Sequence, residues 1–436
     1  MKKSRLDGTD WHFRPDHPPA FGCADCYLQS TCGGLRVKGA ALDCQRFCCH
    51  KADCQLVCFN SPINYAKRLQ EIGGFDLANI QGCDPVRFER IRGYAPLFHH
   101  AYSRKEAFVG EVAAVSLYEL LTRDGSPKYF SRDDVVRNFR ISPDAKLIVS
   151  GVHEDRFLER VWASPHRTSI ALMLKSIGVA IFTPPNFSVY NNVPRPENLY
   201  NIKRIGLISR EFLAAGVPTA LHVNACTDTD YDRYYAFLLA RPEFEAISFD
   251  FITGPGYPSR MWWHIRKLIE IKNKLPRQMQ LVLRGGTQAL NALSGAYSHI
   301  VVIDSDPLHR ALHRQRMIFG NDGRMRIVKN PLAEGVPVDQ LVVQNVAAAK
   351  LRFEYSMQNP HIARYLKRRL PPANYADDKS RQLDLLTNSR DFKLRVGSVN
   401  TQRVISTSKS KRTAEVEQTT KEIAKATAMP GGSPKS

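Results

Sequence analysis

Eight of the ten cysteines lie between residues 23 and 58, and cysteine thiolates are strong ligands for soft metal ions. In a reducing compartment such a cluster binds zinc or an iron–sulfur cluster more often than it forms disulfides. Eight thiolates fill two four-cysteine zinc sites, two four-iron clusters, or one site with bystanders, and the spacing does not decide between zinc and iron–sulfur. The candidate ligands are Cys23, Cys26, Cys32, Cys44, Cys48, Cys49, Cys54 and Cys58.

A second set of polar residues follows short apolar runs that are typical of buried parallel strands. Reactive side chains in parallel α/β folds gather at the carboxyl ends of the strands, so we expect these residues to line one site. Each also has a structural interpretation: Asp155 can cap a helix, and His222 can be a structural rather than a catalytic residue. The candidate catalytic residues are Glu154, Asp155, Asn186, His222 and Asp250.

A short motif after another apolar run has the composition of an anion site. In Arg284-Gly285-Gly286-Thr287 the glycines can expose backbone N–H groups, and the threonine can cap the helix that follows. We therefore predict that these four residues bind a phosphate or another cofactor anion. A tight strand-to-helix turn explains the same motif equally well.

The elements that must position these residues alternate between apolar runs and amphipathic segments. Strands are predicted at 112–120, 146–151, 179–183, 219–224, 246–252, 280–284 and 299–304, most of them followed by a helix. This alternation of strands and helices indicates an α/β fold with a parallel sheet. Seven strands are one short of a closed barrel, and 325–328 is the candidate for the eighth. A barrel-like (βα)-repeat domain is our first expectation, and an open doubly wound sheet is the second.

The domain organisation follows from changes in the apolar pattern and composition along the chain. We expect a cysteine-rich metal module over 1–60, a bridging segment over 61–110 and the barrel-like domain over 111–370. Residues 371–436 lose the apolar pattern and are predicted to form a disordered basic tail. Cys83 and Cys226 lie outside the cluster and are expected to be small buried residues rather than ligands.

Three stretches of the central region resemble a known protein family. They are 153–162 (HEDRFLERVW), 185–190 (PNFSVY), and a stretch with Pro194, Asn201 and Arg204 that leads to 216–218 (GVP). Over about residues 146–225 the chain resembles the uncharacterised prokaryotic family Domain of Unknown Function number 4417, which is often encoded by phages and plasmids. The resemblance implies an α/β domain from a mobile element and no established activity. After Asn224 the chain departs from the family's pattern.

Charge and hydropathy restrict the function classes. The net charge of +20 favours nucleic acid or another polyanion as a partner, although a basic surface also serves solubility. No apolar run approaches the ~18 residues of a membrane span, and the first ten residues lack the pattern of a secretory signal, so we expect a cytoplasmic protein without a membrane partner. The sequence contains no phosphate-binding P-loop and no nucleophile elbow.

Three functional hypotheses remain from the sequence. The first is a metal-containing protein that associates with nucleic acid and processes it through its α/β domain. The second is an enzyme that acts on a phosphorylated small molecule and carries an attached zinc or iron–sulfur module. The third is a non-catalytic interaction scaffold. The sequence indicates no oligomeric state.

Overall fold

The computed structural model describes most of the chain between the cysteine-rich segment and residue 358. The described residues are 23, 26, 29–34, 54–101, 104–190, 193–256, 258–329 and 337–358. The predicted tail over 371–436 therefore lies outside the described residues, as do Cys44, Cys48 and Cys49.

Eight parallel strands form one sheet in which neighbours along the chain are also neighbours in space. The order is β4-β3-β2-β1-β8-β7-β6-β5, so β1 pairs with both β2 and β8. The strands are β1 (Gly93–Phe98), β2 (Val112–Ser116), β3 (Lys146–Ser150), β4 (Val179–Thr183), β5 (Leu221–His222), β6 (Ala246–Asp250), β7 (Gln280–Arg284) and β8 (His299–Asp304).

The two ends of this sheet meet, which makes the sheet a barrel. A parallel bridge joins Phe182 of β4 to Thr219, two residues before β5. Two backbone hydrogen bonds accompany it, from the Phe182 N–H to the Pro218 carbonyl at 2.7 Å and from the Ala220 N–H to the Phe182 carbonyl at 2.8 Å. The predicted barrel-like (βα)-repeat domain is therefore confirmed, with its weakest strand contact between β4 and β5.

The barrel interior is a packed core rather than a channel. Side chains alternate between the two faces of a strand, so every second residue points inward. One buried apolar cluster takes small or branched side chains from around the barrel, including Ala95, Ile148, Ile181, Ala246 and Val301. The alternate residues pack outward against the helices in a second, larger cluster. This alternation explains why the strands read as continuous apolar runs.

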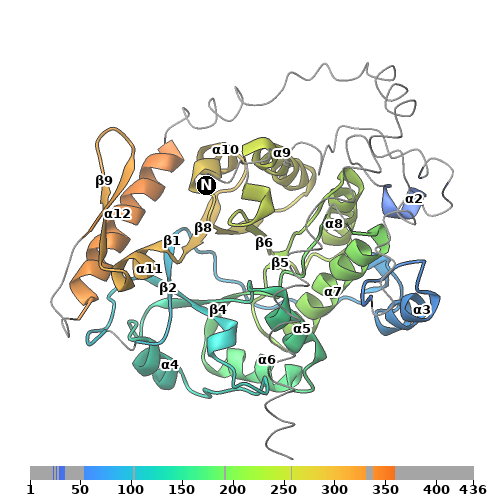
Figure 1. Ribbon diagram of the computed structural model, residues 1–436, viewed down its shortest axis with the longest axis horizontal. Helices are drawn as coiled ribbons and strands as arrows, with labels where there is room; N and C mark the ends of the chain where they lie inside the picture. Colours follow the sequence, from blue (N-terminus) through green and yellow to red (C-terminus); the bar gives the residue numbers. More distant parts are fainter. Residues whose placement is uncertain are drawn as a thin grey trace, which may run out of the picture. The chain divides into compact units, whose positions relative to one another are not determined.

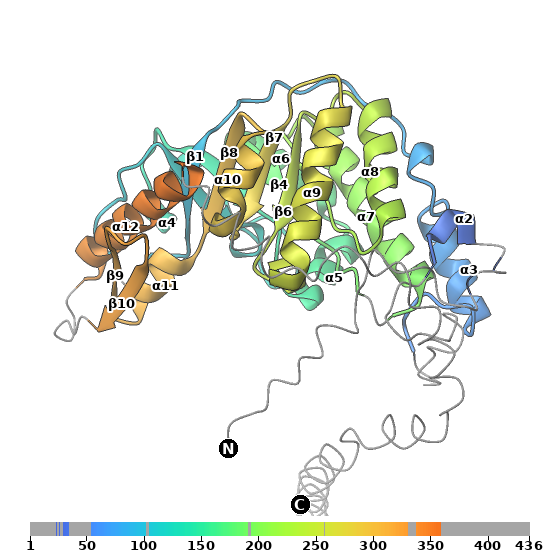
Figure 2. The ribbon, with the colours of Figure 1, turned by 90° about the horizontal axis from the view of Figure 1, so that it is seen from above.

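Helices surround the strands (Figure 1), and α8, α9 and α10 lie side by side along one flank (Figure 2). Among the described helices, none is both long and apolar enough to cross a membrane. The helices are α2 (Gln29–Cys32), α3 (Pro62–Glu71), α4 (Arg132–Phe139), α5 (Asp155–Ala163), α6 (Arg167–Ser176), α7 (Arg195–Ala214), α8 (Asp228–Ala240), α9 (Pro258–Lys274), α10 (Leu290–Ser294), α11 (Asp306–Leu312) and α12 (Asp339–Gln358). Short 3₁₀ turns are η1 (Leu77–Asn79), η2 (Leu117–Glu119), η3 (Gly254–Gly256) and η4 (Thr287–Ala289).

The identity of the eighth strand corrects the sequence prediction. The segment expected to supply it forms β10 (Met325–Lys329), which pairs antiparallel with β9 (Gln315–Phe319) in a separate hairpin. The missing barrel strand is β1, in the segment interpreted as a bridge over 61–110. Its sequence contains Pro96, which weakens the local strand signal, and pairing with β2 and β8 overrides that signal.

Candidate active site

A cavity of about 780 Å³ opens at the carboxyl ends of strands β3 to β7. This end of a (βα)8 barrel is where the loops after the strands converge and where such barrels carry their active sites. The polar lining residues include Glu154, Asp155, Asn186, Ser188, Tyr190, Cys226, Asp250, Arg260, His264 and Arg284. Four of the five predicted catalytic residues are therefore together in one cavity.

The side of the cavity beyond β3 and β4 presents hydroxyl and carboxylate groups. Asp155, the first residue of α5, accepts hydrogen bonds from the Ser188 hydroxyl at 2.6 Å and the Tyr190 hydroxyl at 2.9 Å. Glu154 is exposed and forms an ion pair with Arg156 at 2.9 Å. This wall is suited to bind the hydroxyl groups of a ligand.

Arg284 spans the barrel beneath the cavity. It ends β7, and its Nη1 donates to the Ser150 hydroxyl at 3.2 Å and to the Val152 carbonyl at 3.0 Å, both at the carboxyl end of β3. Strands β3 and β7 lie on opposite sides of an eight-stranded ring. Burial lowers the pKa of the guanidinium, and the Asp250 carboxylate opposes that shift.

Asp250 is a buried carboxyl beside this arginine. It ends β6 and is paired in register with Arg284 on β7. Its Oδ1 accepts the Ile252 N–H at 2.7 Å, and its side chain is part of the cavity wall. Burial raises the pKa of Asp250, while the Ile252 N–H and the Arg284 charge partly offset that rise. A carboxyl in such a setting holds a proton at higher pH than an exposed aspartate does.

Helix α9 contributes two cavity residues that the sequence analysis missed. Arg260 and His264 are four residues apart, so they lie on the same face of the helix, and both line the cavity. The signal that could have found them is this i, i+4 pair in the first two turns of the helix that follows β6. They belong to a helix rather than to a strand end, so the strand-end pattern does not indicate them.

The remaining predicted catalytic residue lies below the cavity. His222 is 2% exposed, and its Nδ1 is 3.1 Å from the Ser248 hydroxyl. Ser248 precedes Asp250 by two residues on β6, so the His222–Ser248 pair lies one layer deeper in the barrel. Burial lowers the pKa of His222 to about 3, so the imidazole is neutral. This placement agrees with the structural interpretation of His222.

The glycine motif after β7 forms a tight turn outside the cavity lining. Gly285 and Gly286 have φ angles of +68° and +71°, and a Cβ on Gly286 would come within 2.5 Å of the Phe251 ring. The Gly285 N–H already donates to the Ile303 carbonyl at 3.2 Å. Thr287 begins η4 without a side-chain cap, and Gly286 takes the cap position instead. Of the four predicted cofactor-binding residues, only Arg284 lines the cavity.

Behind the side of the cavity that Asp155, Ser188 and Tyr190 form, aromatic side chains enclose an arginine. The Arg204 guanidinium lies 4.0 Å from the Phe187 ring centroid and 5.4 Å from that of Trp162. It also forms a bidentate pair with Glu159 at 2.6 and 2.9 Å. The residues that carry the family resemblance described above therefore divide into two groups. Some form this structural cluster, and others line the cavity.

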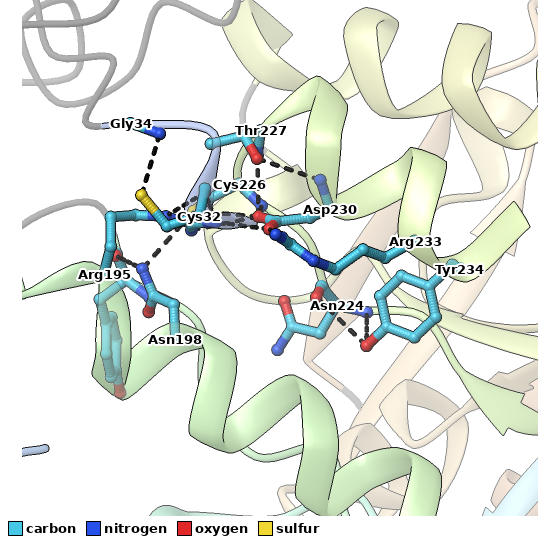
Figure 3. Close-up of polar contacts among 11 residues, drawn as sticks. Cys32, Gly34, Arg195, Asn198, Asn224, Cys226, Thr227, Asp230, Arg233 and Tyr234 are labelled. Carbon is cyan, nitrogen blue, oxygen red and sulfur yellow. Dashed lines mark hydrogen bonds and ion pairs between the residues drawn. The ribbon is translucent and has the colours of Figure 1, made fainter. Parts of the chain in front are cut away.

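A buried ion pair lies beneath the cavity wall after β5. Arg195 begins α7 and Asp230 lies in the first turn of α8, and their side chains are 3% and 0% exposed, with Nη2 to Oδ1 at 2.5 Å (Figure 3). Arg195 Nη1 also donates to the Cys226 sulfur at 2.9 Å. Burial raises the pKa of Cys226 to about 12, and the nearby Arg195 charge only partly opposes this. Cys226 is thus a buried neutral thiol in the cavity wall.

The described cysteine segments both contact the first turn of α7. The Cys32 carbonyl accepts two hydrogen bonds from Arg195, at 2.7 and 3.1 Å (Figure 3). The Val57 N–H, next to Cys58, donates to Glu197 at 2.6 Å. The Cys32 sulfur accepts the Gly34 N–H at 3.2 Å. Segments far apart in the sequence therefore meet at one place on the barrel domain.

The fold and cavity define the molecule as a (βα)8 barrel with a polar site at its carboxyl mouth. No family model matches the chain, and no curated protein matches it. The resemblance to Domain of Unknown Function number 4417 therefore stays a prediction.

Among solved structures, the tryptophan synthase alpha chain of Legionella pneumophila subsp. pneumophila is similar at 9% identity and a TM-score of 0.33, over 67% of this chain and 97% of that one. A 2,3-dimethylmalate lyase of the PEP mutase/isocitrate lyase superfamily is similar at 13% identity and a TM-score of 0.29, over 62% of this chain and 94% of that one.

Proposed function

We propose that the protein is an enzyme whose barrel-mouth cavity binds a phosphorylated small molecule and transfers a proton with Asp250. The observation that carries the proposal is the meeting of Asp155, Asn186, Asp250, Arg260 and Arg284 in one cavity at the carboxyl ends of the strands. A pocket that combines convergent polar groups with a titratable group of shifted pKa is the usual form of an active site.

The charge distribution around the cavity supports an anionic ligand with hydroxyl groups. Arg260 and Arg284 are contributed by α9 and β7, and arginine is well suited to phosphate because its donors match phosphate oxygens in pairs. Asp155 and its hydroxyl partners are contributed by the loops after β3 and β4, where ligand hydroxyls can donate to a carboxylate. One end of the ligand is therefore anionic and the other is hydroxylated.

Asp250 is suited to proton transfer because of its surroundings. Its Oδ1 is held by the Ile252 N–H, so Oδ2 is the oxygen left for a ligand. The raised pKa lets the carboxyl act as a general acid closer to neutral pH than an ordinary aspartate. The charge of Arg284 beside it limits the rise in the pKa of Asp250, which favours the ionised form that can accept a proton.

Calorimetric binding of glycerol 3-phosphate, with glycerol as the matched ligand without phosphate, tests the proposal on the full chain. We expect glycerol 3-phosphate to bind and glycerol not to bind. Arg260→Gln removes a cavity cation and should weaken binding at least about tenfold, which corresponds to about 1.4 kcal/mol. Arg266→Gln is the control because Arg266 is an exposed arginine on the same helix.

Two results would contradict the proposal. One is equal binding of glycerol 3-phosphate and glycerol. The other is equal loss of affinity in Arg260→Gln and Arg266→Gln, because a general charge effect would then account for binding.

We also propose that the cysteine segments bind zinc or an iron–sulfur cluster. Their contact with one turn of α7 supports this, as does the Cys32 sulfur, which accepts a backbone hydrogen bond of the kind that tunes metal thiolates. Within the described residues, no three candidate ligands come close enough for a metal ion. Three of the eight cysteines lie outside those residues.

Nucleic-acid association stays a prediction. The observation that favours it is the exposed basic hairpin of β9 and β10, where Arg316, Arg324, Arg326 and Lys329 are exposed. Of these, Arg326 forms an ion pair with Asp322 at 2.7 Å, which reduces its availability to phosphate. Binding that falls steeply with rising salt would support this partner.

A further inference from the structure

A buried tyrosine on α8 contacts one of the cavity residues of α9. The Tyr231 hydroxyl is 2.8 Å from His264 Nδ1, and the two residues are 2% and 3% exposed. The rings of Trp263 and Phe249 lie beside the imidazole, with centroids at 4.7 and 5.2 Å. The Tyr231–His264 hydrogen bond is therefore enclosed by aromatic side chains.

The position of the histidine proton follows from the hydrogen-bond partners of Tyr231. Among the described residues, His264 Nδ1 is the acceptor within reach of the Tyr231 hydroxyl. A buried hydroxyl proton requires an acceptor, so Tyr231 donates and Nδ1 accepts. A neutral imidazole with an accepting Nδ1 carries its proton on Nε2.

The surroundings also keep this imidazole uncharged. Burial lowers the pKa of His264 to about 3, and the positive charge of Arg260 acts in the same direction. At neutral pH the ring is therefore neutral. Since Nδ1 is occupied and the residue lines the cavity, Nε2–H is the group left for a ligand.

We propose that His264 is a neutral hydrogen-bond donor that binds a phosphate oxygen of the ligand through Nε2–H, with its tautomer set by Tyr231. The inference rests on the proposed function, because it assigns a role within the same cavity. Arg260 and Arg284 supply charge to the anion, and His264 supplies a directed donor without adding a further charge to a buried site.

Asn186 indicates the other chemical requirement on the ligand. This residue lines the cavity, is 9% exposed, and its buried Oδ1 has no hydrogen-bond partner among the described residues. A buried acceptor without a partner is unfavourable, and a donor on the ligand would satisfy it. The ligand class is therefore a phosphate ester that also carries a hydroxyl or amino donor.

Nitrogen-15 NMR of the histidine rings in the full-length protein tests the tautomer without an activity assay. His264→Gln identifies the His264 signals by their loss. We expect the Nε2-protonated neutral form of His264 from pH 5 to 8, and a shift of the Nε2–H signal when glycerol 3-phosphate is added. His222 is the internal control because it is a buried imidazole outside the cavity lining.

Tyr231→Phe tests the role of the tyrosine, and Tyr297→Phe is its matched control. Tyr297 is also buried, but its hydroxyl donates to the Leu268 carbonyl at 2.7 Å and not to a histidine. We expect Tyr231→Phe to give a mixture of His264 tautomers and several-fold weaker binding of glycerol 3-phosphate. Tyr297→Phe should leave both unchanged.

The outcomes separate this inference from the proposed function. If glycerol 3-phosphate binds but His264 is charged, is protonated on Nδ1 or does not respond, the role of His264 is wrong and the cavity proposal stands. The role is also wrong if Tyr231→Phe and Tyr297→Phe behave alike. If glycerol 3-phosphate does not bind, the proposed function fails, and the ligand role of His264 fails with it.

Discussion

Asp250 shows how one buried residue links stability to the proposed chemistry. Its carboxyl lies in the cavity wall, where burial raises its pKa, and the Ile252 N–H and the Arg284 charge partly oppose that rise. At pH values between the unfolded and folded pKa, the Asp250 carboxyl is mostly ionised in the unfolded chain but mostly protonated in the folded protein. The ionised carboxylate therefore weakens folding at neutral pH.

Asp250→Asn should raise the stability of the protein at pH 7. Asparagine keeps the Oδ1 acceptor for the Ile252 N–H but removes the buried charge. A raised folded pKa means that the wild type loses stability as pH rises through the window between the unfolded and folded pKa values. The advantage of the variant should therefore disappear below about pH 3.9, the ordinary value for aspartate. Urea unfolding across this pH range measures the difference.

The control is Asp232→Asn, since Asp232 is an exposed aspartate on α8. Equal stability changes in the two variants would contradict the assignment of a special environment to Asp250. Under the proposed function, the more stable Asp250→Asn protein should have lost its catalytic activity.

At the scale of elements, the first turn of α7 connects the barrel with the cysteine segments. Arg195 binds the Cys32 carbonyl and Asp230 of α8, and Glu197 binds the backbone next to Cys58. Asp230 also closes a capping box with Thr227 at the start of α8. One helical turn therefore stabilises the α8 N-terminus, the cavity wall at Cys226 and the two cysteine segments.

Arg195→Met should destabilise the protein by about 3–5 kcal/mol, because it leaves the Asp230 carboxylate buried without its main partner. Burial is the largest single influence and raises the pKa of Asp230, but the charge and hydrogen bond of Arg195, the Arg233 charge and the Cys226 N–H together outweigh it and lower the pKa. The stabilisation from this lowered pKa is present above the unfolded value and is lost as pH falls through the folded value. Denaturant unfolding at pH 7 and pH 3 measures both effects.

The double variant Arg195→Met/Asp230→Leu completes the cycle. It removes both charges, so it should recover a large part of the stability that Arg195→Met loses. Additive losses in the double variant would show that the two side chains do not act as a pair.

At the scale of the whole molecule, the candidate metal ligands Cys32 and Cys58 lie on segments that folding brings to the same turn of α7. The described segments around Cys32 and Cys58 are fastened to the barrel domain through α7. If metal binds there, it binds the folded protein far better than the unfolded chain. Metal loading and folding should therefore stabilise each other.

Protein purified without oxygen should contain stoichiometric zinc, or iron with matching sulfide and an absorption band near ~400 nm. Chelation of the metal should lower the Tm, because the contacts on α7 lose the support of the ligated segments. Elemental analysis and a thermal melt with and without chelator measure both effects. Absence of zinc and of iron would show that the interpretation of the cysteines is wrong.

Much of this molecule could be predicted from local sequence. Apolar runs such as 146–150 and 280–284 form strands because both faces of a barrel strand are buried, and such burial requires continuous hydrophobicity. The positions of Asp155, Asn186 and Asp250 after strands also indicated that they line one site, since the carboxyl ends of parallel strands lie at one edge of the sheet.

Local sequence patterns establish the α/β class and the set of residues that follow the strands. That β1 completes the ring is evident only from the folded chain, because its pairing with β2 and β8 depends on contacts distant in sequence. The same holds for His264, whose proton position depends on Tyr231 of another helix. Local patterns report which face of an element is buried, whereas barrel closure and the proton on a ring nitrogen depend on which residues folding brings together.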